Sequence, residues 1–188
     1  MTDVVRKLDS DYLTEIKNLS QLYKEKIKNL ILDEDIGVLR ETIERIAEIW
    51  EKSVVSKDIY NEAIALADIG FSCFILDAII EYKRHKLEPE RILRFRAEQD
   101  LTDVYATFMY FVELMKETIP PYYMILEDAR KKLEDSIEFW KKERVSVDEI
   151  KKEDPYVIEE SLATETLLLS DIANRCMILY SIIIKQII

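Results

Sequence analysis

Apolar residues recur along most of the chain at intervals of three and four, the spacing that places them on one face of an α-helix. Between Leu39 and Trp50 the apolar positions are separated by four, three and four residues. Helices are predicted over about 10–32, 33–55, 58–86, 89–118, 124–143 and 155–188. Because the connections are short, we expect an all-α fold, an antiparallel bundle of about six helices in a single domain spanning 1–188.

Two of these helices differ from the ordinary amphipathic type. From Ala63 to Ile80, apolar and small residues occur all the way round the helix, which is typical of a helix buried on most sides. The second half of the last helix, up to Ile188, is also apolar around nearly its whole circumference. We therefore expect a buried central helix and an apolar C-terminal helix.

The predicted ends of the helices carry capping residues. Ser56 and Asp58 precede the central helix, and Asp154 is followed by Pro155, a residue suited to the first position of a helix. Ser146 and Glu149 have the spacing of a capping box, so a short helical turn is expected there.

Composition excludes several classes of protein. The chain has only two glycines, whereas β-hairpins, bulges and phosphate-binding loops depend on that residue. A net charge of −11 makes a nucleic-acid partner unlikely, although the segment 83–96 is rich in lysine and arginine. Cys73 and Cys176 lie in apolar segments without metal-ligand spacing, so we expect buried, reduced thiols.

Charged side chains inside the apolar segments need partners, because an unpaired buried charge is costly. Asp171 and Arg175 are four residues apart and can form an ion pair along the last helix. Asp68 and Asp77 in the central helix have no cation in register. Either they pair with arginines of other helices, or they converge with Glu98 on a metal or a cationic ligand.

An enzymatic alternative rests on Glu41 and Glu44, two carboxylates one turn apart, as Mg²⁺ ligands often are. All-α nucleotide hydrolases that bind Mg²⁺ place such pairs on two successive helices. Asp68 fits the second pair, but Ala65 stands where its other carboxylate is needed. A divalent-metal-dependent nucleotide hydrolase with Glu41, Glu44 and Asp68 as ligands is therefore the alternative to a non-enzymatic function.

The C-terminal helix carries more apolar surface than one buried face requires, and an exposed patch of that size is unusual for a monomer. Two interpretations stay open: the helix runs through the middle of the bundle, or it pairs with a second copy of the chain. We predict a homodimer with Leu179, Ile182, Ile183 and Ile187 at its twofold interface.

The leading function predicted from the sequence is a non-enzymatic interaction or assembly protein without a cofactor. It would act through oligomerisation and through contacts with another protein. The polar N-terminus has no signal-peptide pattern, and the last apolar run is too short to span a bilayer. We therefore expect a cytoplasmic protein with no membrane span. The abundance of Ile, Lys and Glu is typical of a thermophile.

Overall fold

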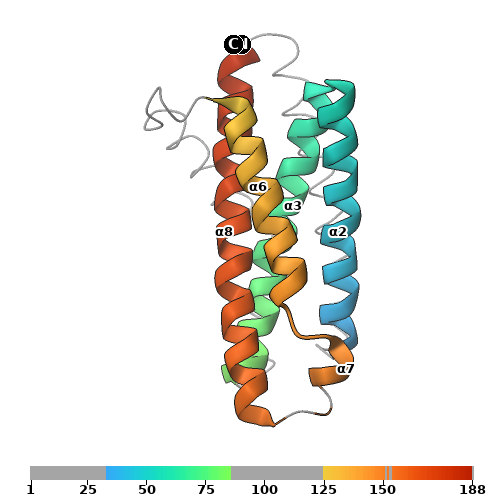
Figure 1. Cartoon of the computed structure of the whole chain (residues 1–188), viewed down its shortest axis with the longest axis vertical. Coiled ribbons are helices and arrows are strands. Elements are labelled where there is room, and N and C mark those ends of the chain that lie inside the picture. Colours follow the sequence, from blue (N-terminus) through green and yellow to red (C-terminus); the bar gives the residue numbers. More distant parts are fainter. Residues whose placement is uncertain (1–32, 86–124, 151, 153, 188) are drawn as a thin grey trace, which may run out of the picture.

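The computed structural model describes residues 33–85, 125–150, 152 and 154–187 (Figure 1). Every regular element within these ranges is an α-helix, and they contain no strand, so the all-α class is confirmed. The helices predicted over about 10–32 and 89–118 lie outside the described residues. The elements are α2 (Asp33–Ser56), α3 (Ile59–His85), α6 (Leu126–Glu143), α7 (Val147–Ile150) and α8 (Pro155–Ile187).

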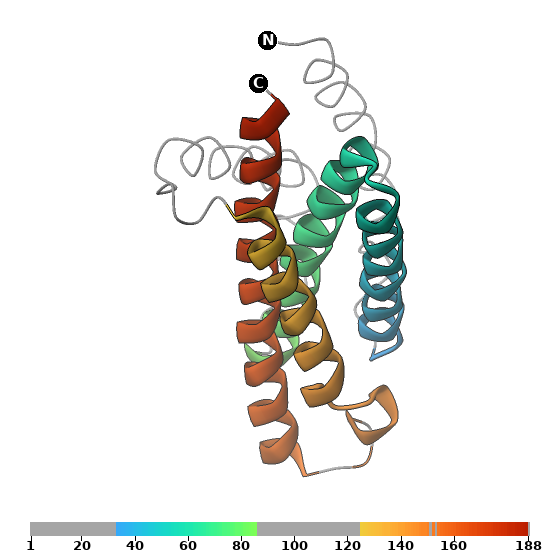
Figure 2. The same ribbon diagram turned by 45° about the horizontal axis from the view of Figure 1, so that its top comes forward.

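The four long helices pack side by side in the order α2, α3, α8, α6. Helix α3 lies against both α2 and α8, and α6 packs on the other side of α8. Following the colours of Figure 1, each helix in this series runs antiparallel to the one it packs against. The short helix α7, which follows α6 and precedes α8 in the sequence, contacts the N-terminal end of α2 (Figure 2).

Helix α3 is the central helix that the sequence predicts. Its side chains are buried all the way round from Ala63 to Cys73, and Asp68 among them is only 8% exposed. Small residues in this stretch, such as Ala63, Ala67 and Gly70, allow α2 and α8 to approach the α3 backbone closely. A helix between two neighbours has little surface left for water, which explains its lack of a polar face.

The apolar surplus of α8 is covered inside the chain. Leu179, Ile182 and Ile183 are 0–1% exposed, although all three were predicted at a dimer interface. Side chains that are already buried have no free surface for a second copy. The structure thus corresponds to the internal interpretation of the C-terminal helix. Ile187 is the last residue of α8, and its side chain lies outside the described ones.

The turn between α2 and α3 is stabilised by a Schellman-type arrangement. Lys57 has φ 57°, a left-handed conformation that ordinarily favours glycine. Its N–H donates to the carbonyl of Val54 at 3.1 Å, and the N–H of Asp58 donates to that of Ser53 at 2.9 Å. The Asp58 carboxylate then accepts from the Asn61 N–H at 3.1 Å, so Asp58 caps α3, whereas Ser56, also predicted as a cap there, is the last residue of α2.

The other predicted caps are confirmed. Ser146 N–H donates to Glu149 Oε2 at 2.8 Å, and Glu149 N–H donates to Ser146 Oγ at 3.2 Å, which is a reciprocal capping box. The side-chain hydrogen bond to Ser146 lowers the pKa of Glu149. At the start of α8, Asp154 accepts from the Tyr156 N–H at 2.8 Å, with Pro155 as the first helical residue.

Two helices are long and apolar enough to cross a membrane by length and composition, over Ile59–Glu81 in α3 and Pro155–Ile184 in α8. Most of each apolar window is buried inside the structure, 82% for α3 and 61% for α8. The core helix of a soluble protein meets the same criterion. The C-terminal apolar run is short on its own, but α8 continues it well beyond the length that a bilayer requires.

Candidate interaction site between α2 and α6

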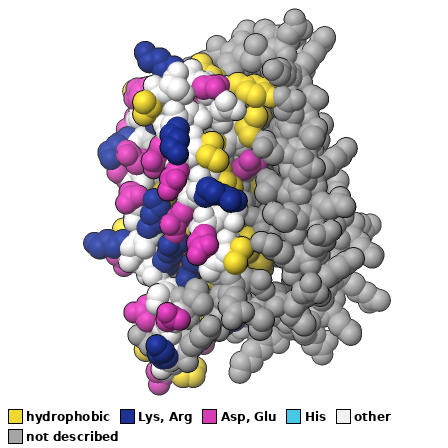
Figure 3. Space-filling model, turned by 90° about the vertical axis from the view of Figure 1, so that its right-hand side faces the viewer, with side chains coloured by type: hydrophobic (Ala, Val, Ile, Leu, Met, Phe, Trp, Pro, Cys, Tyr) yellow, Lys and Arg dark blue, Asp and Glu magenta, His cyan; other side chains and the backbone are white. Residues whose placement is uncertain are grey.

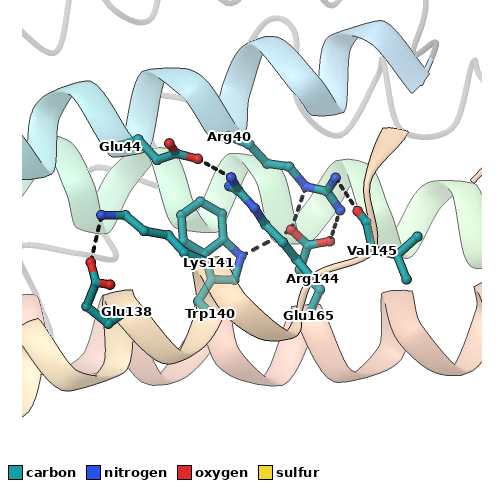
Figure 4. A network of polar contacts seen from close by, with 8 residues as sticks. All are labelled: Arg40, Glu44, Glu138, Trp140, Lys141, Arg144, Val145 and Glu165. Carbon is teal, nitrogen blue, oxygen red and sulfur yellow. Dashed lines mark hydrogen bonds and ion pairs between the residues drawn. The ribbon is translucent and has the colours of Figure 1, made fainter. Parts of the chain in front are cut away.

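A buried ion pair joins α2 to α8. The Arg40 guanidinium approaches the Glu165 carboxylate with two nitrogens (Figure 4), and Arg40 Nε donates to Glu165 Oε1 at 2.9 Å. Only 5% of the Arg40 side chain and 1% of the Glu165 side chain are exposed. Such a pair is compatible with a folded core only when the remaining polar atoms also find partners.

Two further groups complete this buried cluster. The third guanidinium nitrogen, Arg40 Nη1, donates to the carbonyl oxygen of Val145 at 2.7 Å. The indole Nε1 of Trp140 donates to Glu165 Oε1 at 3.1 Å. The cluster therefore fixes α2, α8, the end of α6 and the following loop relative to one another, and its saturated hydrogen bonds indicate a structural role.

A second arginine, Arg144 at the end of α6, connects α6 to α2. The guanidinium of Arg144 lies 4.5 Å from the centre of the Trp140 ring and forms an ion pair with Glu44 on α2 (Figure 4). Stacking over an aromatic face is favourable for a guanidinium. Glu44, predicted as a magnesium ligand, is thus the partner of an arginine.

At the other end of α6, Arg130 is held by the first turn of α3. Its Nε and Nη2 donate to the two carboxylate oxygens of Glu62 at 2.8 and 2.5 Å, and Glu62 is fully buried. Glu127 accepts from Arg130 Nη1 at 2.7 Å. The hydrogen bond to Glu62 is the main reason that the pKa of Arg130 is raised.

At the Arg130 end of α6, α2 and α6 leave a groove with a volume of about 350 Å³. The two helices are not among the closely packed helix pairs of the described part. The groove is lined on α2 by Trp50, Glu51, Val54 and Val55, and on α6 by Glu127, Arg130, Lys131 and Glu134. We call this strip, from the groove to the Arg144–Glu44 pair, the α2–α6 seam.

The surface around the seam is charged rather than apolar. Figure 3 shows acidic and basic side chains interspersed over the described part of that side, with a few separate hydrophobic groups. Several of these charges pair along α6 itself, such as Lys132 with Asp128 at 2.6 Å. Val55 is the most exposed large hydrophobic residue of the described part, at 83%, and it lies at the groove.

The predicted metal ligands occupy three different environments. Glu41 is exposed on the outer face of α2, Glu44 is paired with Arg144, and Asp68 is buried on α3. Among the described residues, no group of three or more His, Cys, Asp or Glu side chains is placed to hold a metal ion. The magnesium-dependent alternative therefore gains no support from the geometry and stays a prediction.

The other polar residues predicted from the sequence do not form a common site within the described part of the chain. Asp171 and Arg175 are joined on α8, with Nε and Oδ2 2.7 Å apart, and Ser136 of α6 donates to the same oxygen at 2.7 Å. Their side chains are 44% and 34% exposed, so this ion pair lies at the rim and not in the core. Asp77 is half-buried on α3, and Glu98 lies outside the described residues.

The buried charges Arg40, Glu62 and Glu165 were not predicted from the sequence. A signal for all three exists in the sequence. Arg40 lies in register with Ile36 and Ile43, which are both fully buried. Glu62 and Glu165 occupy equivalent positions in the stripes of α3 and α8. A charge in register with an apolar stripe predicts a buried, paired side chain.

Both cysteines match the expectation from the sequence. Cys73 on α3 and Cys176 on α8 are buried and free. Burial raises the pKa of both thiols, because the charged thiolate is poorly solvated in an apolar interior. They are therefore unreactive core residues and contribute no chemistry to the seam.

The described helices define an all-α protein with a closed core and one open seam between its outermost helices. Comparison with known protein families, characterised proteins and solved structures finds no match. A function for the chain therefore has to be argued from its own residues.

Proposed function

We propose that the chain is a non-enzymatic protein-interaction and assembly protein that binds another polypeptide along the α2–α6 seam. The observation that carries this proposal is the open packing order of the helices. Among the described helices, α2 and α6 each pack closely against one long helix, α3 and α8 respectively, and the groove lies between them. In a closed four-helix arrangement each helix would contact two neighbours. The seam is thus the place where another polypeptide can complete the packing.

The simplest partner is a second copy of the chain in a twofold homodimer. The seam presents apolar and charged groups together, and Val55 at its edge is largely exposed. A stable interface buries at least about 1,000 Å². The flanking faces of α2 and α6 would therefore have to contribute besides the groove. A different protein is the second possibility, and it would use the same seam.

Two further features belong to this proposal. The segments 10–32 and 89–118 would supply two more helices, which gives an antiparallel bundle of about six. The chain would work in the cytoplasm without a membrane span. Support for this comes from the exposed charges of α6, such as Lys131, Lys132 and Asp135, because lipid offers exposed charges no solvation. Purification in the aqueous phase without detergent tests whether the chain works without a membrane.

Light scattering during size-exclusion chromatography tests the self-association. At micromolar concentration we expect twice the 22.3 kDa of the single chain. Val55→Arg, at the groove, should return the chain to a monomer. Phe139→Arg is the matched control, since Phe139 is 51% exposed on α6 and is not among the residues that line the groove. A wild-type monomer, or dissociation by the control alone, contradicts a homodimer through the seam.

The metal-dependent alternative has its own test. Thermal unfolding of the full chain with and without Mg²⁺ or Mn²⁺ measures whether an ion binds the folded state. An interaction protein without a metal site shows the same transition temperature in both cases. A concentration-dependent rise that Glu41→Gln or Asp68→Asn abolishes would instead establish the metal site that the enzymatic alternative requires.

A further inference from the structure

The groove has room for no more than about one turn of a helix. A helix with its side chains is about 10 Å across and rises about 5.4 Å per turn, which corresponds to roughly 400 Å³ for one turn. The groove holds about 350 Å³. It can therefore receive one or two side chains of a segment that lies across the seam, while the backbone of that segment stays outside.

The charges along the groove favour a cation. Arg130 is already neutralised by the buried carboxylate of Glu62. Lys131 is paired within α6, with Asp135 Oδ1 at 2.6 Å and with Glu134 Oε2 at 3.3 Å. Glu51 is exposed and makes no ion pair with the described residues. Carboxylates thus outnumber the available cations among the charged lining residues, which are Glu51, Glu127, Arg130, Lys131 and Glu134.

Trp50 adds an apolar wall and an unused hydrogen-bond donor. The residue is only 2% exposed, and its indole Nε1–H has no acceptor within the part of the chain that the structure describes. A buried donor without an acceptor is costly and uncommon. Trp50 lines the groove, and an indole attracts cationic groups. Val54 and Val55 extend the apolar wall along α2.

We propose that the groove recognises a lysine or arginine side chain of a basic polypeptide segment. The aliphatic part of that side chain packs on Val54 and Val55, and its charged end lies near Glu51. This inference rests on the proposed function and narrows it, because it makes the preferred partner a basic segment of another protein rather than a second acidic copy.

The experiment uses the full chain labelled with 5-fluorotryptophan, whose two tryptophans give two fluorine NMR signals. Single Trp→Phe variants assign them. The probe is a synthetic helical peptide of leucine and lysine, with the leucines at helical spacing. We expect saturable binding that shifts the Trp50 signal and leaves Trp140 unchanged, and no shift with a peptide that carries glutamine instead of lysine. Equal shifts of both signals, or none, overturn the proposal.

General attraction to an acidic protein is the main competing explanation, and a matched pair of variants separates it. Glu51→Lys and Glu41→Lys change the net charge equally and lie on the exposed side of the same helix, about 15 Å apart along its axis. We expect Glu51→Lys to weaken peptide binding about fivefold or more, and Glu41→Lys less than about twofold, since screened charges act locally. Equal weakening by both variants overturns the proposal.

Two further outcomes distinguish this inference from the proposed function. If the peptide fails to bind while the wild-type chain self-associates in a manner that depends on Val55, the inference is wrong and the proposed function stands. If the small polyamine spermine shifts the Trp50 signal as strongly as the peptide does, the groove is a site for small cations, and recognition of a polypeptide is overturned.

Discussion

Replacing Glu165 by glutamine tests whether the Arg40–Glu165 pair holds the helices together as a buried ion pair. The change removes one charge, keeps the size of the side chain and leaves an oxygen that can accept from Trp140. With 5% of the Arg40 side chain exposed, the guanidinium would be left with an uncompensated charge in the core. Breaking a buried pair in this way costs about 3–5 kcal/mol. That is a large share of the roughly 5–15 kcal/mol that stabilises a typical domain.

Urea unfolding followed by far-ultraviolet circular dichroism measures this loss of stability. The control is Lys132→Gln, which removes an ion pair with the short distance of 2.6 Å between side chains that are 50% and 56% exposed. An exposed pair contributes about 0–1 kcal/mol, so this control should unfold almost as the wild type does. A loss below about 1 kcal/mol for Glu165→Gln would show that Arg40 reaches water, which would refute a buried cluster.

A double-mutant cycle sharpens the same prediction. Each single replacement, Arg40→Met or Glu165→Leu, leaves a buried charge without its partner, whereas the double replacement leaves none. The double variant should therefore lose less stability than the sum of the two single variants. Strict additivity would mean that the two side chains do not interact in solution.

Three other changes of stability follow from local geometry. Lys57→Gly should raise the free energy of unfolding by about 0.5–1 kcal/mol because it relieves a left-handed φ of 57°, whereas Lys57→Ala should give no gain. Asp58→Ala should lower it by about 1 kcal/mol through loss of the cap of α3, and an unchanged urea midpoint would contradict that role. Burial raises the thiol pKa of Cys73 and Cys176 above the unfolded value, so the unfolded chain loses these protons first and stability falls as the pH rises above about 9. A Cys73→Ala, Cys176→Ala variant should show a shallower decline above that pH, and equal slopes would contradict the assignment.

The local part of the fold was predictable from the sequence. The ends of α3, α7 and α8 follow from Asp58, the Ser146–Glu149 box and Asp154, because a cap involves only residues within one turn of each other. The buried α3 was predictable because a helix without a polar face has to be covered on all sides.

The contacts between distant helices were not predictable. Arg40 and Glu165 are 125 residues apart, and Glu62 and Arg130 are 68 apart, so each pairing depends on the packing order of the helices. The surface that covers the C-terminal helix also depends on the packing order and could not be predicted. Its composition shows that Leu179 and Ile183 are buried but does not show by which surface, and the structure places that surface within the chain. The groove was not predictable either, since it depends on how α2 and α6 lie relative to one another.

Site-specific photo-cross-linking tests the central claim, an interaction seam between α2 and α6, most directly. A benzophenone side chain is placed at Val55, 83% exposed at the groove, or at Phe139, 51% exposed and not part of the groove lining. The purified chain is irradiated alone and with the leucine–lysine peptide. We predict a covalent adduct to a second polypeptide from position 55 in at least one of these conditions, and little or none from position 139. Adducts from position 139 alone, or from neither position, would contradict the claim that the seam binds a polypeptide.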